Sequence, residues 1–454
     1  MAKHLPISFI EQMKPRLQSE YALFEASLFS EPPVSVRLNT SKIHTENNTL
    51  LRVPWCNVGR YLSHRPIFTL DPLFHAGAYY VQEASSMFLQ TIVEQYVPHD
   101  AIALDLCAAP GGKSIILSDW LNNGLLVSNE IIPSRCAVLV ENLMKWGNER
   151  NVITNSAPRQ FENCPELFDV ILTDVPCSGE GMFRKDDTAI AEWSESNVAQ
   201  CVSRGREILT SALVALRNEG ILIYSTCTFN EQEDEQQVQW LIEQGCELLA
   251  VNVDTSWQIE TTNGYHFWPH RVKGEGLFMA VLKKNGKVNA LNNGSKLKTK
   301  KTIFSKPNKE IIPYLIDRDE FAYACHNQIW RAIPQKYADI VEHLLQCTKV
   351  VYWGVSLVEN KGAKMIPQQS LALNRQLNKR SFCICEITDI DALNYLSGNT
   401  LVLPSSVAKG IVLLTYCNVP IGFVNNLGTR CNNLYPNNWR IRMSWTAPEH
   451  VLMP

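Results

Sequence analysis

The chain has 454 residues, more than one hydrophobic core usually organises, so two or three domains are expected. Its hydrophobic content of 45% is ordinary for a globular protein, and no apolar run approaches the roughly 20 residues that span a bilayer. The segment "MAKHLPISFIEQMK" lacks the long apolar core and the cleavage site of a secretory signal. These features argue against a membrane or secreted protein and predict a cytoplasmic one.

The cysteines favour the same compartment. The 14 of them are scattered, which is typical of reduced thiols rather than of a disulfide framework. No pair has the CxxC spacing of a zinc site. Cys383 and Cys385 have no second cluster near them in the sequence, so we interpret them as strand residues, and no metal is expected.

The net charge of −3 conceals two unlike halves. When Asp and Glu are subtracted from Lys and Arg, the net charge is −14 for residues 1–282 and +11 for residues 283–454. A basic C-terminal half is typical of a chain that grips a polyanion such as nucleic acid. Acidic helix faces in solvent and a basic linker would give the same numbers, so charge alone leaves both interpretations open.

Residues 1–95 are predicted to form a mixed α and β segment. The segments "PISFIEQMKPRL" and "EYALFEASLF" have helical spacing, whereas "SVRLNTSK" and "RPIFTLD" are predicted as short strands. Residues 78–96 are predicted as one helix with an apolar stripe.

Between residues 101 and 282 strands alternate with helices. Strands are expected at 101–107, 124–130, 151–155, 169–174 and 220–227, helices at 112–121, 133–147 and 197–217, and a late hairpin formed by "YHFWP" and 276–284. This alternation predicts a doubly wound α/β fold, a Rossmann-like parallel sheet with helices on both faces. Ligands of such sheets bind at the carboxyl ends of the strands, where every polar motif below is expected.

The remainder is predicted to divide into three parts. Residues 283–309 hold nine lysines and no Asp or Glu, which indicates a flexible basic segment. Because 283 and 284 belong to the predicted last strand, the linker itself is predicted at 285–309. Residues 310–385 are predicted as a small mixed α+β domain and 386–454 as a β-rich module. The first two domains are then 1–95 and 96–284.

A glycine-rich turn, "LDLCAAPGGKS" at 104–114, follows the first strand of this sheet and begins a helix. A phosphate-binding loop would need glycine at Cys107, and the GxGxxG of a dinucleotide site is missing. Backbone amides at such a turn can approach a ligand closely. Glu130 ends the next strand, where an acidic side chain reaches ribose hydroxyls. A tight turn without a ligand is the alternative, and an adenosyl ligand fits the pattern better.

Two cysteines follow neighbouring strands of the predicted sheet. Cys177 stands in "DVPCSGEG" after the fourth strand, and Cys227 in "YSTCTFNEQ" at the end of the fifth. Cysteines such as Cys136, Cys201 and Cys246 are expected to be core residues. Cys177 and Cys227 instead lie among polar residues at strand ends, so both thiols should face one crevice and take part in covalent chemistry.

Methylation of carbon 5 of cytosine is the chemistry that fits two thiols at one site. A thiolate that adds to carbon 6 makes carbon 5 nucleophilic toward a sulfonium methyl, and a base then removes the carbon 5 proton. Asp174 is expected to hydrogen-bond the ring, and Arg184 and Lys185 to bind a phosphate of the substrate. The residues alone do not say which cysteine attacks.

These motifs resemble those of the Sun-type RNA cytosine-5 methyltransferases. The resemblance is carried by "LDLCAAPGGKS", "DVPCSGEG" and "YSTCTFNEQEDE", with "VRLNTSK" (36–42) and "AYYVQEASSM" (78–87) before them. Three further segments, "GEGMFRKD", "KGEGLFMAVL" (273–282) and "PIGFVNNLGTRCNNLYPNNWRIR" (420–442), are similar to the ribosomal small-subunit methyltransferase F group of Gram-positive type, the last to its PUA-like RNA-binding module. The resemblance covers nearly the whole chain.

The resemblance implies a role for each matching residue. Cys227 is the nucleophile, Cys177 assists release of the product, and Asp174 serves both catalysis and cofactor binding. S-adenosylmethionine contacts are implied at Cys107, Ala108, Ala109, Pro110, Gly111, Gly112, Lys113, Glu130, Arg135 and Asn155. RNA contacts are implied at Arg37 and Asn39 of the Arg-x-Asn motif, which lies in the family's N-terminal RNA-binding part, and are expected at Arg184, Lys185, Arg440 and Arg442.

Two positions depart from the family pattern. Many relatives carry an Asp after the third strand that contacts adenine, where this chain has "TNSAPRQF" with Ala157, and Asn155 is expected to serve instead. Asn437 stands in "NLYPNNWR" where a lysine is usual, which weakens the expected RNA contact there.

The predicted function is S-adenosylmethionine-dependent methylation of cytosine carbon 5 in small-subunit ribosomal RNA, by a monomer that acts on the RNA or on the small subunit. The same chemistry on transfer RNA or large-subunit RNA is the first alternative, and a non-catalytic ribosome-assembly factor is the second. A thiol hydrolase would need a histidine beside its cysteine, and residues 101–261 contain none.

Overall fold

A ten-stranded mixed sheet forms the centre of the protein in the computed structural model, which describes residues 4–43, 50–286, 302–362 and 364–452. Its strand order is β11-β12-β13-β9-β8-β5-β6-β7-β16, with β10 paired to β13. The strands are β5 (Ile102–Asp105), β6 (Leu125–Asn129), β7 (Asn151–Thr154), β8 (Phe168–Asp174), β9 (Leu216–Thr226), β10 (Cys246–Leu249), β11 (Glu260–Thr261), β12 (Tyr265–Phe267), β13 (Leu277–Lys284) and β16 (Val350–Trp353).

The parallel part of this sheet confirms the predicted doubly wound fold. Strands β7, β6, β5, β8 and β9 are parallel neighbours, and β13 closes them from one side as the predicted hairpin strand. The chain moves outward from β5 in both directions, which is the strand reversal that opens a crevice at the carboxyl ends.

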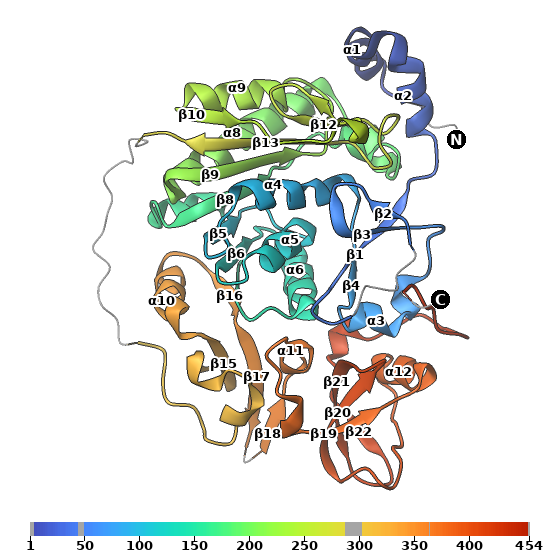
Figure 1. The fold of residues 1–454 in the computed structure, drawn as a ribbon, viewed down its shortest axis with the longest axis vertical. Coiled ribbons are helices and arrows are strands. Elements are labelled where there is room, and N and C mark those ends of the chain that lie inside the picture. Colours follow the sequence, from blue (N-terminus) through green and yellow to red (C-terminus); the bar gives the residue numbers. More distant parts are fainter. Residues whose placement is uncertain (1–3, 44–49, 287–301, 363, 453–454) are drawn as a thin grey trace.

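Apolar side chains alternate between the two faces of the sheet, as the pleat requires. Leu104 belongs to one buried cluster and Ala103, its neighbour on β5, to another. Each cluster is completed by helices on its own face, so the sheet is covered on both sides (Figure 1). The helices of this part are α4 (Leu89–Tyr96), α5 (Gly112–Trp120), α6 (Pro133–Trp146), α7 (Asp187–Glu192), α8 (Glu195–Ala215) and α9 (Glu235–Glu243).

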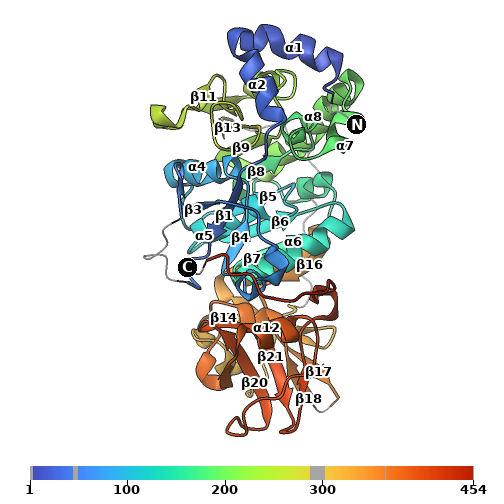
Figure 2. The ribbon, with the colours of Figure 1, turned by 90° about the vertical axis from the view of Figure 1, so that its right-hand side faces the viewer.

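The N-terminal segment comprises two helices and a small sheet. Helices α1 (Ile7–Leu17) and α2 (Tyr21–Leu28) precede a sheet of order β2-β3-β1-β4. Helix α3 (Pro72–His75) lies between β3 and β4 in the chain. The strands are β1 (Val34–Leu38), β2 (Arg52–Val53), β3 (Cys56–Leu62) and β4 (Tyr79–Val81). Figure 2 shows the two helices at the opposite end of the molecule from the C-terminal modules.

Two local predictions in this segment are wrong. Residues 79–81 do not begin a helix, because Leu38 pairs with Tyr79 and adds β4 to the small sheet; the helix starts only at Leu89. "RPIFTLD" is not a strand but contains the 3₁₀ helix Phe68–Leu70. Asp71 ends that turn and caps α3, since its carboxylate accepts the Leu73 amide at 2.9 Å.

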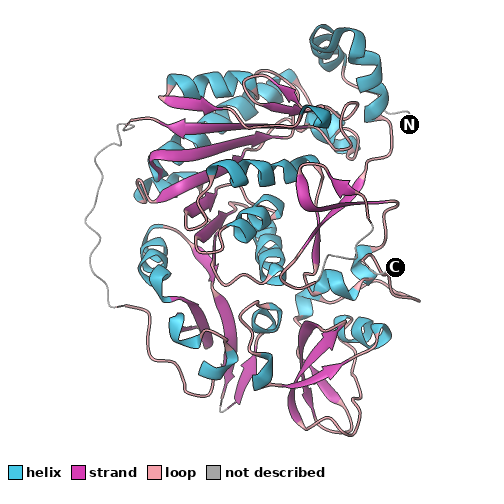
Figure 3. Ribbon diagram, viewed as in Figure 1, coloured by secondary structure: helices cyan, strands magenta, loops and turns pink. Residues whose placement is uncertain are grey.

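Two small sheets form the C-terminal part (Figure 3). The first has β14 (Phe321–His326), β15 (Ile329–Pro334), β17 (Val355–Lys361) and β18 (Lys364–Pro367), with α10 (Ala338–Cys347) and α11 (Gln369–Leu373). The second has β19 (Cys383–Glu386), β20 (Gly410–Tyr416), β21 (Val419–Asn426) and β22 (Cys431–Asn433), with α12 (Asp389–Leu396). Cys383 and Cys385 are strand residues, as predicted.

The first of these modules does not stand apart from the central sheet. Its strand β16 crosses over and pairs antiparallel with β7, with Trp353 opposite Val152. The second module shares a core with the N-terminal sheet, where Val36 and Leu38 pack with Leu393 and Val412. Most of the predicted basic linker, residues 287–301, lies outside the described residues. Among the described helices, none has the length and apolar character needed to cross a membrane.

An aromatic cluster fastens α1 and α2 to the loops after β8 and β9. Phe24 of α2 is fully buried, with its ring 5.1 Å from that of Phe229 and 5.6 Å from that of Trp268. Phe9 of α1 lies 5.1 Å from Phe183. Because Phe183 follows Cys177 by six residues and Phe229 follows Cys227 by two, the N-terminal helices support both cysteine loops.

Replacement of Phe24 by alanine tests this packing. We expect Phe24→Ala to lower the free energy of unfolding by about 3–5 kcal/mol, because a large buried ring leaves a cavity. Phe29 closes the same helix but is 48% exposed, so Phe29→Ala is the matched control and should change stability little. Urea denaturation followed by tryptophan fluorescence measures both, and equal losses would contradict the assignment.

Candidate active site

The carboxyl ends of β5, β6, β8 and β9 open into one cleft of about 1000 Å³. Its walls come from the ends of these strands, from the 3₁₀ helix Pro158–Asn163 and from α8. Of the predicted site residues, the cleft is lined by Cys107, Ala109, Glu130, Arg135, Asp174, Cys177 and Cys227. The sheet topology therefore brings most of the predicted centre together.

The two cysteines face each other inside this cleft. Their Sγ atoms are 2.9 Å apart, and the Cys227 amide donates to the Cys177 sulfur at 3.3 Å. This proximity follows from the register of β8 and β9, in which Asp174 lies opposite Ser225. The hydrogen bond to Cys227, together with burial and the charge of Cys227, raises the pKa of Cys177 well above its usual value. Cys177 is therefore a thiol at neutral pH.

A fully buried polar network fixes the two cysteine loops to each other. Glu180 accepts hydrogen bonds from the Trp193 indole at 2.9 Å, the Phe229 amide at 2.8 Å and the Asn230 amide group at 3.0 Å. Glu233 accepts from the Ser178 amide at 2.9 Å and from Asn230 at 2.7 Å. Asn230 thus joins one carboxylate from each loop, which holds the backbone on both sides of the thiol pair.

Lys113 and Asp174 form an ion pair beside the thiols, with Nζ 2.8 Å from Oδ2. Burial alone would lower the pKa of Lys113, but the Asp174 carboxylate, its hydrogen bond and the charge of Cys227 raise it. Lys113 is therefore a permanent cation whose charge acts on the Cys227 sulfur. Lys113 is held there because it occupies the first turn of α5, directly after the glycine turn.

The glycine turn keeps its backbone close to the cleft. Gly111 adopts φ +114°, a conformation that favours glycine, and it precedes the first residue of α5. Ala108 and Pro110 belong to the same turn, in which the Ala108 amide donates to the Asn129 carbonyl at 2.8 Å. Asp105 lies behind this turn, and its burial raises its pKa to about 7. The Ser114 hydroxyl donates to Asp105 at 2.6 Å.

Glu130 presents a carboxylate at the end of β6. Its Oε1 accepts the Ile132 amide at 2.8 Å, and its Oε2 lies 3.6 Å from the Arg135 guanidinium. Arg135 in turn donates to the Ala109 carbonyl at 2.8 Å. The side chains of Glu130 and Arg135 thereby connect the turn after β5 with the turn after β6.

Asn155 does not line the cleft. Its amide group donates to the Glu130 and Ile131 carbonyls at 2.8 and 3.0 Å, and its carbonyl oxygen accepts the Lys349 ammonium at 3.1 Å. It borders a second cavity between α6 and the C-terminal modules instead. Asn155 supports the backbone after β6, and Ala157 is the neighbouring residue in the cleft, so the adenine contact of Asn155 stays a prediction.

Three of the predicted RNA contacts lie inside the protein. Arg37 is 2% exposed and donates to Gln90 at 2.9 Å and Asp119 at 3.2 Å. Asn39 is also buried and donates to the Gly77 and Trp146 carbonyls. The side chain of Arg184 is 5% exposed and donates to Glu275 at 2.9 Å. These residues hold the N-terminal segment and the loop after β8 in place, and an RNA contact by them stays a prediction.

The other predicted RNA contacts are more accessible. Lys185 is exposed, with its ammonium 3.4 Å from Glu275. Arg442 is exposed and donates to the Asn437 carbonyl at 2.6 Å. Arg440 and Asn437 line the second cavity, not the cleft with the cysteines. An RNA contact at these positions would thus lie outside the thiol cleft.

Sequence reasoning missed two groups of residues. Glu180, Asn230 and Glu233 lie within the quoted motifs. The signal that could have indicated a buried network is that these polar residues stand close to aromatic residues, which the structure buries. Arg159 and Arg204 line the cleft and are exposed, and neither has an ion-pair partner within the described ranges. Arg204 is one polar residue of a long helix, so nothing in the sequence distinguished it.

Comparison with known proteins agrees with this geometry. Residues 92–283 match the family model for the 16S rRNA methyltransferase RsmB/F, residues 5–84 that for the N-terminal domain of 16S rRNA methyltransferase RsmF, and residues 384–441 that for the methyltransferase RsmF PUA domain. Two solved structures from Pyrococcus horikoshii share the fold. NSun6 with SFG is 19% identical with TM-score 0.53, covering 63% of this chain and 100% of its own. A methyltransferase homolog protein is 25% identical with TM-score 0.51, covering 62% and 100%.

Full-length relatives give the family. The ribosomal RNA small subunit methyltransferase F of Salmonella heidelberg is 29% identical, with 96% of this chain and 97% of the relative covered. That of Shewanella oneidensis is 31% identical over 95% of this chain and 96% of the relative. With this identity over nearly its whole length, the chain belongs to the ribosomal RNA small subunit methyltransferase F family.

Proposed function

We propose that this protein transfers a methyl group from S-adenosylmethionine to carbon 5 of a cytosine in small-subunit ribosomal RNA, through a covalent adduct with Cys227. Its family gives the general activity, methylation of ribosomal RNA. The observation that carries the finer proposal is the pair of sulfurs 2.9 Å apart at the carboxyl ends of β8 and β9. Methylation of an exocyclic nitrogen would need no such pair, whereas addition to a pyrimidine ring needs a thiol nucleophile.

The residues of the cleft fit S-adenosylmethionine. Its volume of about 1000 Å³ suits a nucleoside-sized ligand together with a flipped base. Glu130 offers a carboxylate to ribose hydroxyls, with Oε1 held by the Ile132 amide and Oε2 3.6 Å from Arg135, and the turn from Cys107 to Gly112 offers backbone close to the ligand. When bound, the cofactor supplies an electrophilic methyl group on a sulfonium centre.

The remaining chemistry falls to Cys227, Lys113 and Asp174. The Cys227 thiolate forms a bond with carbon 6 of the ring, and the displaced electrons make carbon 5 nucleophilic. The Lys113 ammonium, paired with Asp174, supplies a positive charge beside the two thiols. The Asp174 carboxylate, held by Lys113, accepts a hydrogen bond from the protonated ring nitrogen and stabilises that positive charge.

Release of the product is assigned to Cys177. After methylation, a base must remove the carbon 5 proton before the bond between Cys227 and carbon 6 can break. The Cys177 thiol donates a hydrogen bond to the departing sulfur, which stabilises the negative charge that the sulfur regains. Without Cys177 the adduct should therefore form but persist.

Substitution of the two cysteines separates these roles. We expect Cys227→Ala to abolish methyl transfer to small-subunit RNA, and Cys177→Ala to leave a covalent protein–RNA complex that survives denaturing electrophoresis. Cys201→Ala is the control, since Cys201 is a core residue of α8 outside the cleft. Transfer of labelled methyl to free RNA, to the subunit and to transfer RNA measures the first effect. Labelling of transfer RNA alone would contradict the substrate, and an adduct in Cys227→Ala would contradict the nucleophile.

The buried network around Glu180 tests whether loop position matters for chemistry. We expect Glu180→Gln to lower kcat about 100-fold with little change in cofactor affinity, because an amide can no longer accept all three donors and the cysteine loops shift. Glu192→Gln on the exposed face of α7 is the control. Single-turnover kinetics and cofactor titration measure the two quantities; a loss of cofactor affinity alone would assign Glu180 to binding.

The exposed arginines of the cleft are proposed to bind RNA phosphates. Arg159 and Arg204 come from the 3₁₀ helix and from α8, the two walls outside the strands. We expect the double variant Arg159→Gln, Arg204→Gln to reduce the slope of log binding constant against log salt by about 1.4, the value for two lost contacts to single-stranded RNA. Arg217→Gln should leave the slope unchanged, because Arg217 begins β9 at the opposite end and pairs with Asp169. Equal slopes in all three proteins would refute this contact.

A further inference from the structure

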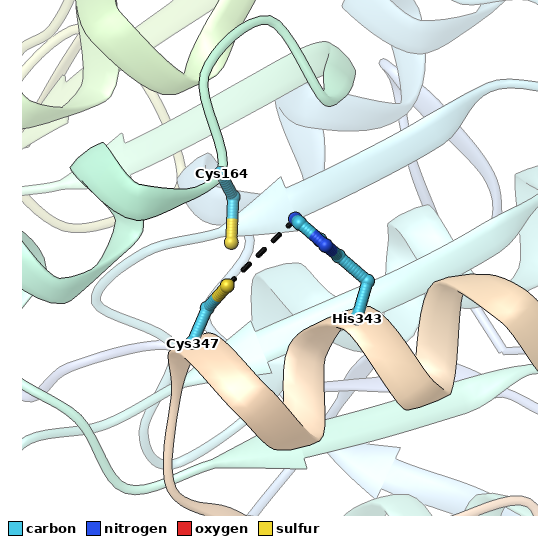
Figure 4. Close-up of side chains that lie close together, drawn as sticks. All are labelled: Cys164, His343 and Cys347. Atoms are coloured by element: carbon cyan, nitrogen blue, oxygen red, sulfur yellow. Dashed lines mark hydrogen bonds between the residues drawn. The ribbon is translucent and has the colours of Figure 1, made fainter. Parts of the chain in front are cut away.

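Three side chains with soft or borderline metal-binding atoms meet behind the wall of the cleft (Figure 4). Cys164 directly follows the 3₁₀ helix Pro158–Asn163, and His343 and Cys347 lie one turn apart on α10. Their ligand atoms all lie within 4.8 Å of one another. The spacing of four residues brings His343 and Cys347 to one face of the helix, and Cys164 approaches that face from the neighbouring segment.

The distances suit a tetrahedral metal ion. Zinc lies about 2.3 Å from sulfur and about 2.0–2.1 Å from imidazole nitrogen, so two tetrahedral ligands of these types are about 3.6 Å apart. The Cys347 sulfur is 3.8 Å from Nε2 of His343. The two atoms form a hydrogen bond, and their separation is close to the spacing that a shared zinc ion imposes.

Charge also favours a divalent cation. Two thiolates and a neutral imidazole around a doubly charged ion give a site without net charge, which suits a position where Cys164 is fully buried.

We propose that Cys164, His343 and Cys347 form a structural binding site for zinc(II), with a water molecule as the fourth ligand. The fourth position is open to solvent because His343 and Cys347 are only half-buried. The site differs from the other two polar clusters. The Cys177 and Cys227 pair has the Lys113 cation beside it, and in the cluster of Asp234, Glu235 and His266 the Arg16 guanidinium already lies 2.6 Å from Glu235 and 3.0 Å from His266.

Such an ion would join the wall of the cleft to the first C-terminal module behind it. Pro158, Arg159 and Glu162 of the 3₁₀ helix line the cleft, and Cys164 ends that segment. Cys347 ends α10, and β16 begins three residues later and pairs with β7. The ion thus fastens the first C-terminal module to the wall of the active site at the point where the module enters the central sheet.

Cobalt(II) titration of the full-length protein tests the site. Protein stripped with a chelator under reducing conditions should take up one equivalent of cobalt and show the near-ultraviolet charge-transfer band of thiolate ligands. We expect Cys347→Ser and His343→Gln to weaken cobalt affinity at least tenfold. Both side chains are half-buried on α10, so these variants should fold, whereas replacement of the fully buried Cys164 carries the risk of a cavity.

Two control variants make the result specific. Cys325→Ser removes an exposed thiol of the same module, and Cys227→Ser removes one thiol of the pair in the cleft. Both should bind cobalt as the wild type does. The absence of a charge-transfer band in the wild type, an unchanged band in Cys347→Ser, or loss of the band in Cys227→Ser would each overturn the proposal.

Thermal unfolding supplies an independent readout that needs no activity. Zinc added to the stripped wild type should raise Tm in a concentration-dependent manner, because a ligand that binds only the folded state stabilises it. The same addition should leave the Tm of Cys347→Ser and His343→Gln unchanged. An equal rise in the variants would show that zinc binds elsewhere and would refute the assignment.

Discussion

The parallel pairing of β8 with β9 is the constraint on which the active site depends. It sets two strand ends side by side, and each end continues into a loop that carries a cysteine, Cys177 after β8 and Cys227 after β9. A shift of one residue in this register would turn a different side of each loop toward the cleft. The buried carboxylates of Glu180 and Glu233 add a second constraint at the same place, since each accepts hydrogen bonds that cross from one loop to the other.

The central sheet and the thiol pair could be predicted from the sequence because their signals are local. Predicted apolar strands of five to eight residues alternate with helices, and the polar motifs follow directly after strands. Parallel sheets have only a few strand orders, so neighbouring ends could be inferred without coordinates. The turn with Gly111, the carboxylate of Glu130 and the facing of Cys177 and Cys227 all follow from this order.

The sequence did not reveal which polar side chains long-range packing would bury. The motif containing Arg37 and Asn39 has charged and polar residues on a strand, and nothing in it reveals that Asp119 and the end of α6 cover them. The sequence predicts Arg184 as a phosphate ligand, but in the structure its guanidinium donates to Glu275, which lies about ninety residues later in the chain. The same limit hid β16, whose partner in the central sheet lies about two hundred residues earlier. Burial of a polar side chain is decided by what packs on it, and that partner is remote in sequence.

The shared core between the N-terminal sheet and the last module has a consequence for the order of folding during synthesis. Val36 and Leu38 emerge from the ribosome early, whereas Leu393 and Val412, which bury them, are made near the end. Contacts between the two ends reinforce this closure, because the Val451 amide donates to Asp71 at 3.1 Å. The small N-terminal sheet therefore remains incomplete while the central domain folds, and it is sealed only when the chain is finished. A protein truncated before its last module would expose an apolar face at its other end.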